Sequence, residues 1–270
     1  MKQSTKHALF TNHFTWGLML ASITTLTLVT LTPATFAATT NFVYDAFVTP
    51  NTTPQNPPWT TVVSGSDIQT ASGRLLTLSV ANDGNAGPYY TVAGINTSIV
   101  NANSEYEVLS RVRVPSSSGP RSLFHAYIGD GTRLVGFGIT NAGANNAIAL
   151  ISTSLTPLSS YTIVPLSGDD FFDIDLRKTG TSGGASDTVT LRVNGTVIDT
   201  QPYTAMSSYP LSPSAELLFG SSNGSGTAGL IELTGASFGI NQAAPALIPE
   251  PSIAALSMAA FGLALVRRRR

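Results

Sequence analysis

Two carboxylates at alternate positions, Asp173 and Asp175, are the best candidates for catalysis in this sequence. Alternate residues of a strand share a face, and a rise of about 3.3 Å per residue puts their carboxyl groups roughly 6 to 7 Å apart. Glycoside hydrolysis needs carboxyl pairs about 5 to 9.5 Å apart, one as acid and one as nucleophile or base. The alternative is a solvated charged face opposite core residues Phe172, Ile174 and Leu176, and the pair could also line a polar groove.

His125 is the only histidine between residues 38 and 247, and the chain has no cysteine. A metal site with two histidine ligands is therefore excluded there, and a serine triad would depend on this residue alone. Without cysteine there is no disulfide, thiolate nucleophile or cysteine-ligated metal. We expect no catalytic centre and no resident metal, and a structural or ligand-contacting role for His125.

Aromatic residues suggest sugar recognition, because a ring can stack on the apolar side of a pyranose while nearby polar groups bind its hydroxyls. Tyr89 and Tyr90 are adjacent, and Tyr127 lies close to His125. The possible glycan-binding residues are therefore Tyr89, Tyr90, His125, Tyr127, Asp173 and Asp175. For the adjacent tyrosines the alternative is one ring in the core and one on the surface. Trp59 fits a core or loop-anchoring role better.

Oxygen ligands of the kind that calcium takes occur in two clusters, residues 82–85 (Asn-Asp-Gly-Asn) and Asp169-Asp170. Neither has the spacing of an EF-hand loop, and turn chemistry accounts for such clusters equally well. We expect no cofactor and leave calcium open.

The elements that carry these residues look like strands. Short apolar runs separated by Gly, Asn, Asp, Ser and Pro recur between residues 38 and 240, without an amphipathic helical period. This pattern predicts one all-β domain, a single antiparallel β-sandwich or jelly roll. The expected strands are 42–47, 75–80, 106–114, 122–128, 134–139, 147–152, 171–177, 188–193, 196–200, 215–219 and 229–238.

Asn194-Gly195 predicts a type I′ hairpin turn, since both central residues must tolerate positive φ. In that register Leu191 faces Ile198, and Arg192 lies near Asp199.

A second hairpin is expected at Asp130-Gly131. It would pair Phe124 with Phe137 and place His125 and Tyr127 on the opposite face. On that face residues 136 and 138 are glycines, which have no side chains to cover it. We expect that face to be open and partly apolar.

Residues 1–37 have the features of a secretory signal peptide: Lys2 and Lys6, an apolar stretch, and small residues before a cleavage site after Ala37. The alternative is an uncleaved membrane anchor. Without these residues and the C-terminal tail, the chain keeps eight basic and fourteen acidic residues. The resulting net charge of −6 disfavours nucleic-acid binding.

The last 23 residues, 248–270, follow a linker at 241–247 and contain three unlike elements in order. These are the tripeptide Pro249-Glu250-Pro251, an uncharged apolar stretch from Ile253 to Val266, and a terminal cluster of arginines, Arg267, Arg268, Arg269 and Arg270. The tail resembles the PEP-CTERM sorting signal of exopolysaccharide-producing Gram-negative bacteria. The resemblance implies a precursor anchored in the inner membrane by a transmembrane helix. It also implies processing by an exosortase, a membrane transpeptidase that recognises the tripeptide, and a final place at the cell surface or in the extracellular matrix. An ordinary C-terminal anchor is the alternative.

The body resembles the concanavalin A-like, laminin-G-type sandwich through loose motifs: residues 44–47 (Tyr-Asp-Ala-Phe), Trp59, and the strands at 105–114, 171–176 and 188–199. Laminarinase-type hydrolases of this fold carry Glu, Asp and Glu at three alternating positions of one strand. The corresponding series here is Asp173, Asp175 and Arg177, so the third acid is missing. Fold alone does not determine activity.

The sequence therefore predicts an exported, exosortase-sorted, non-catalytic protein that associates with extracellular polysaccharide, its main partner, through a lectin-like sandwich. A structural or adhesive matrix protein without a specific glycan site is the first alternative. A secreted polysaccharide hydrolase or lyase is the second.

Overall fold

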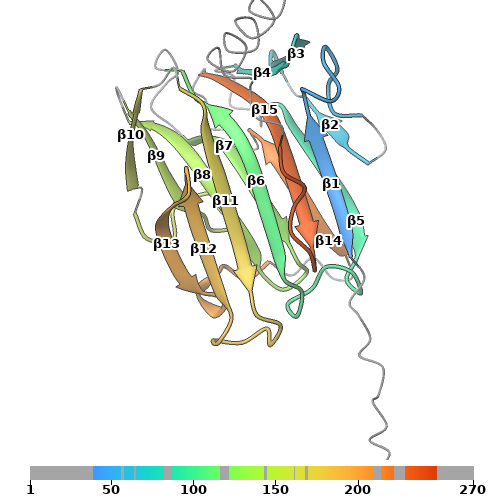
Figure 1. The fold of residues 1–270 in the computed structure, drawn as a ribbon, viewed down its shortest axis with the longest axis vertical. Helices are drawn as coiled ribbons and strands as arrows, with labels where there is room; N and C mark the ends of the chain where they lie inside the picture. Colours follow the sequence, from blue (N-terminus) through green and yellow to red (C-terminus); the bar gives the residue numbers. More distant parts are fainter. Residues whose placement is uncertain are drawn as a thin grey trace, which may run out of the picture. The chain divides into compact units, whose positions relative to one another are not determined.

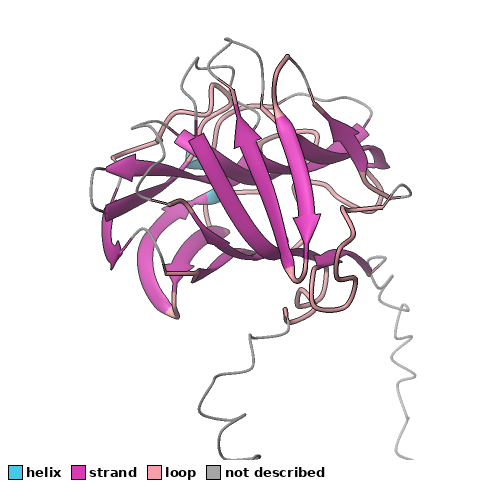
Figure 2. Ribbon diagram, turned by 90° about the horizontal axis from the view of Figure 1, so that it is seen from above, coloured by secondary structure: helices cyan, strands magenta, loops and turns pink. Residues whose placement is uncertain are grey.

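The computed structural model describes residues 39–55, 58–63, 65–81, 87–115, 122–142, 145–160, 162–167, 170–209, 214–221 and 229–247. Within these ranges the chain forms fifteen strands and one short 3₁₀ turn, Tyr203–Ala205 (Figure 2). The prediction of an all-β domain is confirmed. Both predicted targeting segments, 1–37 and 248–270, lie outside the described residues. None of the helices found in these ranges has the length and apolar character needed to cross a membrane.

The strands form two antiparallel sheets that pack as the layers of a sandwich (Figure 1). In the eight-stranded sheet the order is β13 (Thr196–Pro202), β12 (Thr188–Val193), β11 (Phe172–Thr179), β6 (Tyr106–Arg113), β15 (Gly229–Ile240), β4 (Leu75–Val80) and β3 (Ile68–Ser72), with β1 (Thr40–Asp45) beside the end of β15. In the seven-stranded sheet it is β10 (Thr162–Ser167), β9 (Asn145–Leu150), β8 (Leu134–Ala142), β7 (Ser122–Gly129), β14 (Ser214–Gly220), β5 (Tyr89–Asn96) and β2 (Thr60–Val62).

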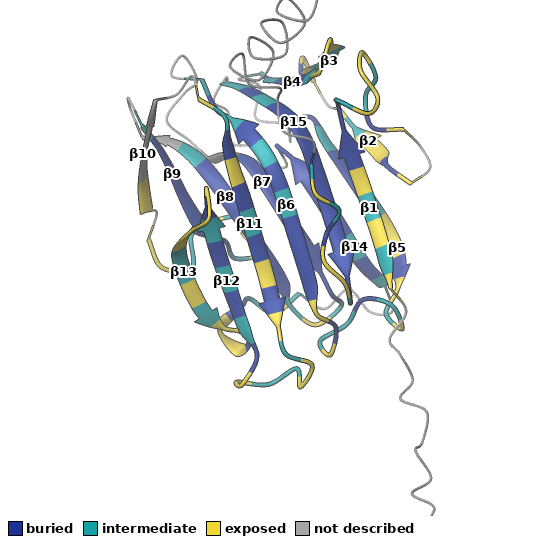
Figure 3. Cartoon of the chain, in the orientation of Figure 1, coloured by how far each residue is buried: buried dark blue, intermediate teal, exposed yellow. Residues whose placement is uncertain are grey.

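The core lies between the sheets, and strand β11 shows how the sequence builds it. Phe172, Ile174 and Leu176 are buried, while Asp173 and Arg177 are exposed and Asp175 is half-buried, in the alternation that Figure 3 shows along β11. This alternation is the period of two that a half-buried strand requires. The apolar members of the strand therefore stabilise the sandwich, and the charges of Asp173, Asp175 and Arg177 lie on the outer face.

Aromatic rings fill one end of the core. Phe219 stacks on Tyr90 with ring centroids 5.2 Å apart and meets the edge of Trp59 at 4.9 Å. Trp59 is 1% exposed and comes directly before β2. It therefore bridges the two sheets directly before β2, since it also contacts Phe238 of β15.

All eleven predicted strands overlap observed ones, and β2, β3, β5 and β10 are additional. Strand β5 escaped prediction because Gly94 (φ 72°) and exposed residues interrupt its apolar pattern. Strands β2 and β3 have few buried side chains, so they lack the periodicity that identifies a strand.

The turn at Asn194-Gly195 is confirmed, with φ values of 48° and 79°. Beyond the turn the predicted register is wrong, because a β-bulge lies between Leu191 and Arg192. Leu191 therefore pairs with Asp199 rather than with Ile198. The side chain of Arg192 points to Asp175 of the neighbouring strand, at 3.5 Å, instead of to Asp199.

The β7–β8 hairpin also differs from its predicted register, by two residues: Phe124 pairs with Ile139, and Ala126 pairs with Phe137. Asp130 causes the shift. Its carboxylate accepts hydrogen bonds from the backbone N–H groups of Thr132 and Arg133, at 2.9 and 2.8 Å, and so builds a four-residue loop. A shift of two residues keeps every side chain on its predicted face.

Residues 241–247, for which the sequence predicts a linker, run back over the outer face of the eight-stranded sheet (Figure 1). We call this segment the C-terminal strap. The backbone N–H of Ala244 donates to the Glu107 carboxylate at 2.7 Å. A Cβ at Gly239 would lie 2.5 Å from the nitrogen of Ala244, and a Cβ at Gly235 would lie 2.7 Å from the Leu247 side chain. Glycine at these two positions is therefore what lets the strap approach the sheet.

Candidate functional site

The outer face of the seven-stranded sheet brings together three of the predicted glycan-binding residues: Tyr89, His125 and Tyr127. Strand β14 lies between β5 and β7, so that His125 is opposite Gly220, which is in turn opposite Tyr89. One row along the sheet, Tyr127 is opposite Leu218. Adjacent rows of one face thus carry residues that are far apart in sequence.

His125 is completely buried, so the expectation that it lines an open surface is wrong. A Cβ at Gly138 would lie 3.1 Å from the imidazole and 2.9 Å from Ile151, which shows how tightly this region is packed. Burial lowers the pKa of His125 to about 4, and neither ring nitrogen has a hydrogen-bond partner among the described residues. The imidazole is therefore a neutral part of the packing and presents no surface to a ligand.

Tyr127 is also covered, with 6% of its surface exposed. It belongs to a small apolar cluster outside the main core, with Leu134, Ile151 and Leu218, and this cluster packs against Leu155 and Tyr209. The open face predicted from glycines 136 and 138 does not exist, because the Ile151 side chain occupies the space above Gly138, where an added Cβ would lie 2.9 Å from it, and Leu155 and Tyr209 pack on the cluster.

Tyr89 and Tyr90 divide as the alternative interpretation states. Tyr90 is fully buried in the main core, where its hydroxyl meets Gln69. Tyr89 is half-buried on the outer face and packs against the cluster around Tyr127. Of the predicted tyrosines, Tyr89 is thus the one with a ring available at the surface.

Glu216 and Tyr209 complete this site, and sequence reasoning missed both. The hydroxyls of Tyr127 and Thr91 each lie 3.3 Å from one carboxylate oxygen of Glu216, and the Tyr209 hydroxyl lies 3.5 Å from the other. Tyr209 and Glu216 are half-buried. We call Tyr89, Thr91, Tyr127, Tyr209 and Glu216 the tyrosine patch.

The phenols of the tyrosine patch stay protonated at neutral pH. Burial and the negative charge of Glu216 raise the pKa values of Tyr89, Tyr127 and Tyr209. The rings of Tyr127 and Tyr209 meet edge to face, with centroids 6.2 Å apart. The patch therefore offers hydroxyl groups, ring surface and one carboxylate, which are the groups that bind sugars.

Asp173 and Asp175 lie on the other sheet, on its outer face, and are not part of the tyrosine patch. Arg111 lies 3.1 Å from the exposed Asp173 carboxylate. Arg177 and Arg192 lie 3.2 and 3.5 Å from Asp175. These contacts match the alternative interpretation of a solvated charged face opposite the core.

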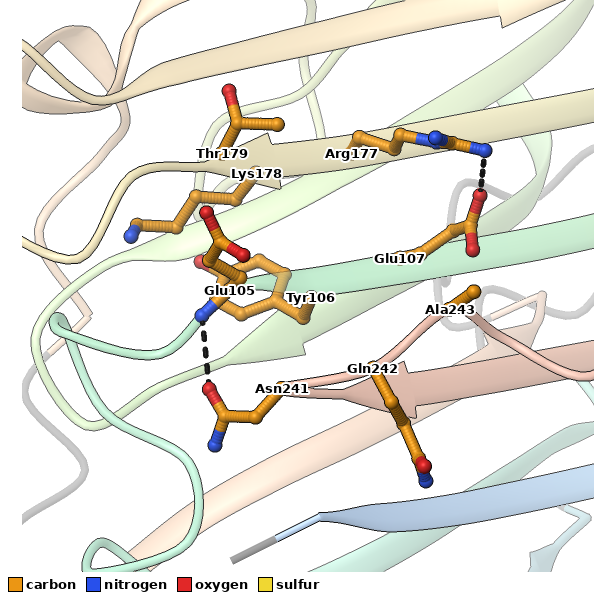
Figure 4. A pocket seen from close by; sticks show the side chains of 9 residues that line it. All are labelled: Glu105, Tyr106, Glu107, Arg177, Lys178, Thr179, Asn241, Gln242 and Ala243. Carbon is orange, nitrogen blue, oxygen red and sulfur yellow. Dashed lines mark hydrogen bonds and ion pairs between the residues drawn. The ribbon is translucent and has the colours of Figure 1, made fainter. Parts of the chain in front are cut away.

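A pocket of about 190 Å³ lies between strands β6 and β11 and the beginning of the C-terminal strap (Figure 4). Its polar groups are occupied by internal bonds. Glu107 pairs with Arg177, and the N–H of Glu105 donates to the Asn241 side chain at 3.1 Å. Lys178 turns away from the pocket into the core. The pocket is smaller than ordinary ligand sites of about 300–1,000 Å³, and its contacts hold the strap.

Of the two clusters with calcium-type oxygen ligands, residues 82–85 and Asp169 lie outside the described residues. In the part of the chain that the structure describes, no group of three or more His, Asp or Glu side chains could hold a metal ion.

No family model matches the chain, and no curated protein sequence matches it. Among solved structures, peanut lectin in complex with a nine-residue peptide has a TM-score of 0.52 and 12% identity, over 76% of this chain and 98% of the lectin. A protein of unknown function from Shewanella oneidensis MR-1 has 19% identity and a TM-score of 0.49, over 84% and 96% of the two chains. An endo-1,3-beta-glucanase from Streptomyces sioyaensis has 11% identity and a TM-score of 0.49, over 80% and 99%.

The likeness to peanut lectin shows the fold, a lectin-type β-sandwich, and agrees with the resemblance found in the sequence. At this level of identity a shared fold does not determine the ligand.

Proposed function

We propose that this chain is an exported, non-catalytic protein that binds an extracellular polysaccharide through the tyrosine patch of its lectin-type sandwich. The observation that carries the proposal is the convergence of the Tyr127 and Tyr209 hydroxyls on the Glu216 carboxylate. Two of the rings, Tyr89 and Tyr209, remain half-exposed beside this carboxylate. Ring faces take the apolar side of a pyranose, and the carboxylate accepts hydrogen bonds from its hydroxyls.

Glycan-array binding by the purified protein tests this function. We expect Tyr209→Ala to weaken binding about tenfold, because a stacked ring at a binding site contributes on the order of 1 kcal/mol or more. Phe47→Ala is the matched control. It removes another half-buried ring, which packs against Arg74 near the end of β1. Equal effects of the two substitutions would contradict a site at Tyr209.

The same purified protein distinguishes the proposed function from its two alternatives, a matrix protein without a specific sugar site and a polysaccharide hydrolase or lyase. Binding to no glycan on the array would favour a structural or adhesive matrix protein without a specific sugar site. Release of reducing ends from bacterial or plant glucans would favour a hydrolase, and a product with a new unsaturated end would favour a lyase.

We propose that an exosortase processes the chain at its C-terminal tail and delivers it to the cell surface or extracellular matrix. This part of the proposal is supported by the sequence of the tail, above all by Pro249, Glu250 and Pro251. In a host with an exosortase, Glu250→Ala should leave a full-length precursor in the membrane. Normal processing and surface release of that variant would contradict the assignment. Asp199→Asn removes a charge within the sandwich and should be processed as the unchanged chain is.

A further inference from the structure

Glu216 has no cationic partner among the residues that the structure describes, unlike several acids on the other sheet. On the outer face of the eight-stranded sheet Arg111 neutralises Asp173, and Arg113 neutralises Glu232. Glu216 contacts hydroxyl groups instead, those of Thr91, Tyr127 and Tyr209. Within the described ranges, the negative charge of this half-buried carboxylate is therefore not balanced by an ion pair.

The hydrogen bonds to Glu216 are long. Hydroxyl donors approach a carboxylate to about 2.5–2.7 Å when the bond is strong. Here the Tyr127 and Tyr209 hydroxyls lie 3.3 and 3.5 Å from the carboxylate oxygens, and the Thr91 hydroxyl, also 3.3 Å away, has a shorter bond of 3.0 Å to the Leu217 carbonyl. The carboxylate oxygens thus keep capacity for a better donor, and an ammonium group provides up to three.

The surroundings of Glu216 also favour a cation. Tyrosine rings attract ammonium groups through their electron-rich faces, and Tyr89 and Tyr209 are half-exposed beside the carboxylate. Their phenols stay neutral because burial and Glu216 raise their pKa values. Arg133, on the loop beside Tyr209, is directed elsewhere: it donates to the Met206 carbonyl and lies 5.7 Å from the centroid of the Tyr203 ring.

We propose that the tyrosine patch selects polysaccharides that carry free amino groups, with an ammonium group of a glucosamine-type residue bound at Glu216. This inference depends on the proposed function and specifies its ligand class. Anionic polymers are disfavoured at the same place, since a uronate would face the Glu216 carboxylate. The net charge of −6 between residues 38 and 247 acts in the same direction at longer range.

The test measures, by titration calorimetry, the affinity of the purified protein for four hexasaccharides. These are the hexamers of glucosamine, N-acetylglucosamine, glucose and galacturonic acid. We expect the glucosamine hexamer to bind about tenfold more tightly than its N-acetylated counterpart, because acetylation removes the positive charge. Raising the salt concentration should reduce this preference, since salt screens the ion pair. Neither measurement needs a variant.

Two variants locate the charge. Glu216→Gln keeps the shape of the side chain and should reduce the preference for glucosamine to about twofold or less. Asp199→Asn changes the net charge equally on β13 of the other sheet and should retain the preference. Thermal unfolding of both variants confirms that each is folded.

The outcomes separate this inference from the proposed function. If the neutral hexamers bind as tightly as the glucosamine hexamer, the inference is wrong and the proposed function stands. The same holds if Glu216→Gln keeps the full preference, or if the galacturonic acid hexamer binds most tightly. If no hexamer and no glycan of the array binds, both are wrong.

Discussion

The ammonium nitrogen of Lys178 lies 3.1 Å from a carboxylate oxygen of Asp187, and both side chains are almost fully excluded from solvent. The same nitrogen donates to the carbonyl oxygens of Ser104 and Gly180, at 2.9 and 2.7 Å. It also lies 4.8 Å from the centroid of the Tyr203 ring. One buried cation thus connects the segment before β6, the β11–β12 loop and the 3₁₀ turn.

Lys178→Met should lower the free energy of unfolding by about 3–5 kcal/mol, because it leaves the buried Asp187 carboxylate without its cation. Urea denaturation measures this loss. Arg192→Met is the control, because Arg192 is 31% exposed and its ion pair with Asp175 is long, at 3.5 Å. We expect that control to cost less than about 1 kcal/mol. Similar losses in the two variants would show that Lys178 is not essential to the fold.

Stability should fall on mild acidification because of His125. Its pKa is about 4 in the folded chain, against an ordinary value of 6.5. Between these pH values the unfolded state binds a proton that the folded state does not. The contribution of His125 to the free energy of unfolding is therefore constant above pH 6.5 and is lost as the pH falls toward 4. The expected loss is on the order of 3 kcal/mol. Comparing wild type with His125→Leu between pH 7 and pH 4 isolates this residue, since carboxylates titrate in both. Parallel stability curves would contradict the assignment.

Tyr127→Ala should destabilise the protein by about 3 kcal/mol, because the ring is packed and not displayed. Tyr127→Phe removes only the hydroxyl that reaches Glu216 and should cost about 1 kcal/mol. Tyr209→Ala, at a half-exposed ring, should change stability less than Tyr127→Ala does. Thermal unfolding of the three variants gives the order, and a stable Tyr127→Ala protein would mean that the ring is exposed.

Gly136→Ala should cost about 1–3 kcal/mol, since overpacking forces neighbours to move. The added Cβ would lie 2.3 Å from the Cβ of Tyr127 and 2.8 Å from the Ala126 carbonyl oxygen. Gly184→Ala in the β11–β12 loop is the control, because its Cβ would meet only the Ser182 hydroxyl, at 3.2 Å. Equal melting temperatures for the two variants would contradict the packing described for β7 and β8.

Asn194→Val should cost about 2 kcal/mol, because a β-branched residue is strained at positive φ. The substitution also removes the side-chain oxygen that accepts a hydrogen bond from the Asp173 N–H at 2.9 Å. Asn194→Gly loses only that bond and should cost about 1 kcal/mol or less. Calorimetric melting of the two variants tests this order, and a melting temperature for Val equal to that for Gly would argue against the turn.

The periodicity of the sequence predicts which face of each strand is buried. It does not predict which strands lie side by side in a sheet. The alternation of Phe172, Asp173 and Ile174 predicts which side chain enters the core, because that choice depends on adjacent residues alone. That β14 lies between β5 and β7 depends on pairings between residues more than 80 positions apart, such as Leu218 with Thr91 and Tyr127. No local pattern encodes such a pairing, so the tyrosine patch could not be assembled from the sequence.

A weak signal for Glu216 does exist. It is a single acid within the apolar run 215–219, where a charge is costly unless the strand presents it to a polar surface. Tyr209 gives no comparable signal, because it lies outside the strands and reaches the patch through a bond from its N–H to the Thr132 carbonyl.

The C-terminal strap determines how the sandwich would be oriented when held from its tail. The strap stays against the eight-stranded sheet as far as Leu247, and Ile248 alone separates that residue from Pro249. A tether attached beyond this point therefore pulls on the eight-stranded side, while the tyrosine patch belongs to the outer face of the opposite layer. If the chain is held by its tail as proposed, the Glu216 carboxylates lie on the layer opposite the one to which the strap is bound.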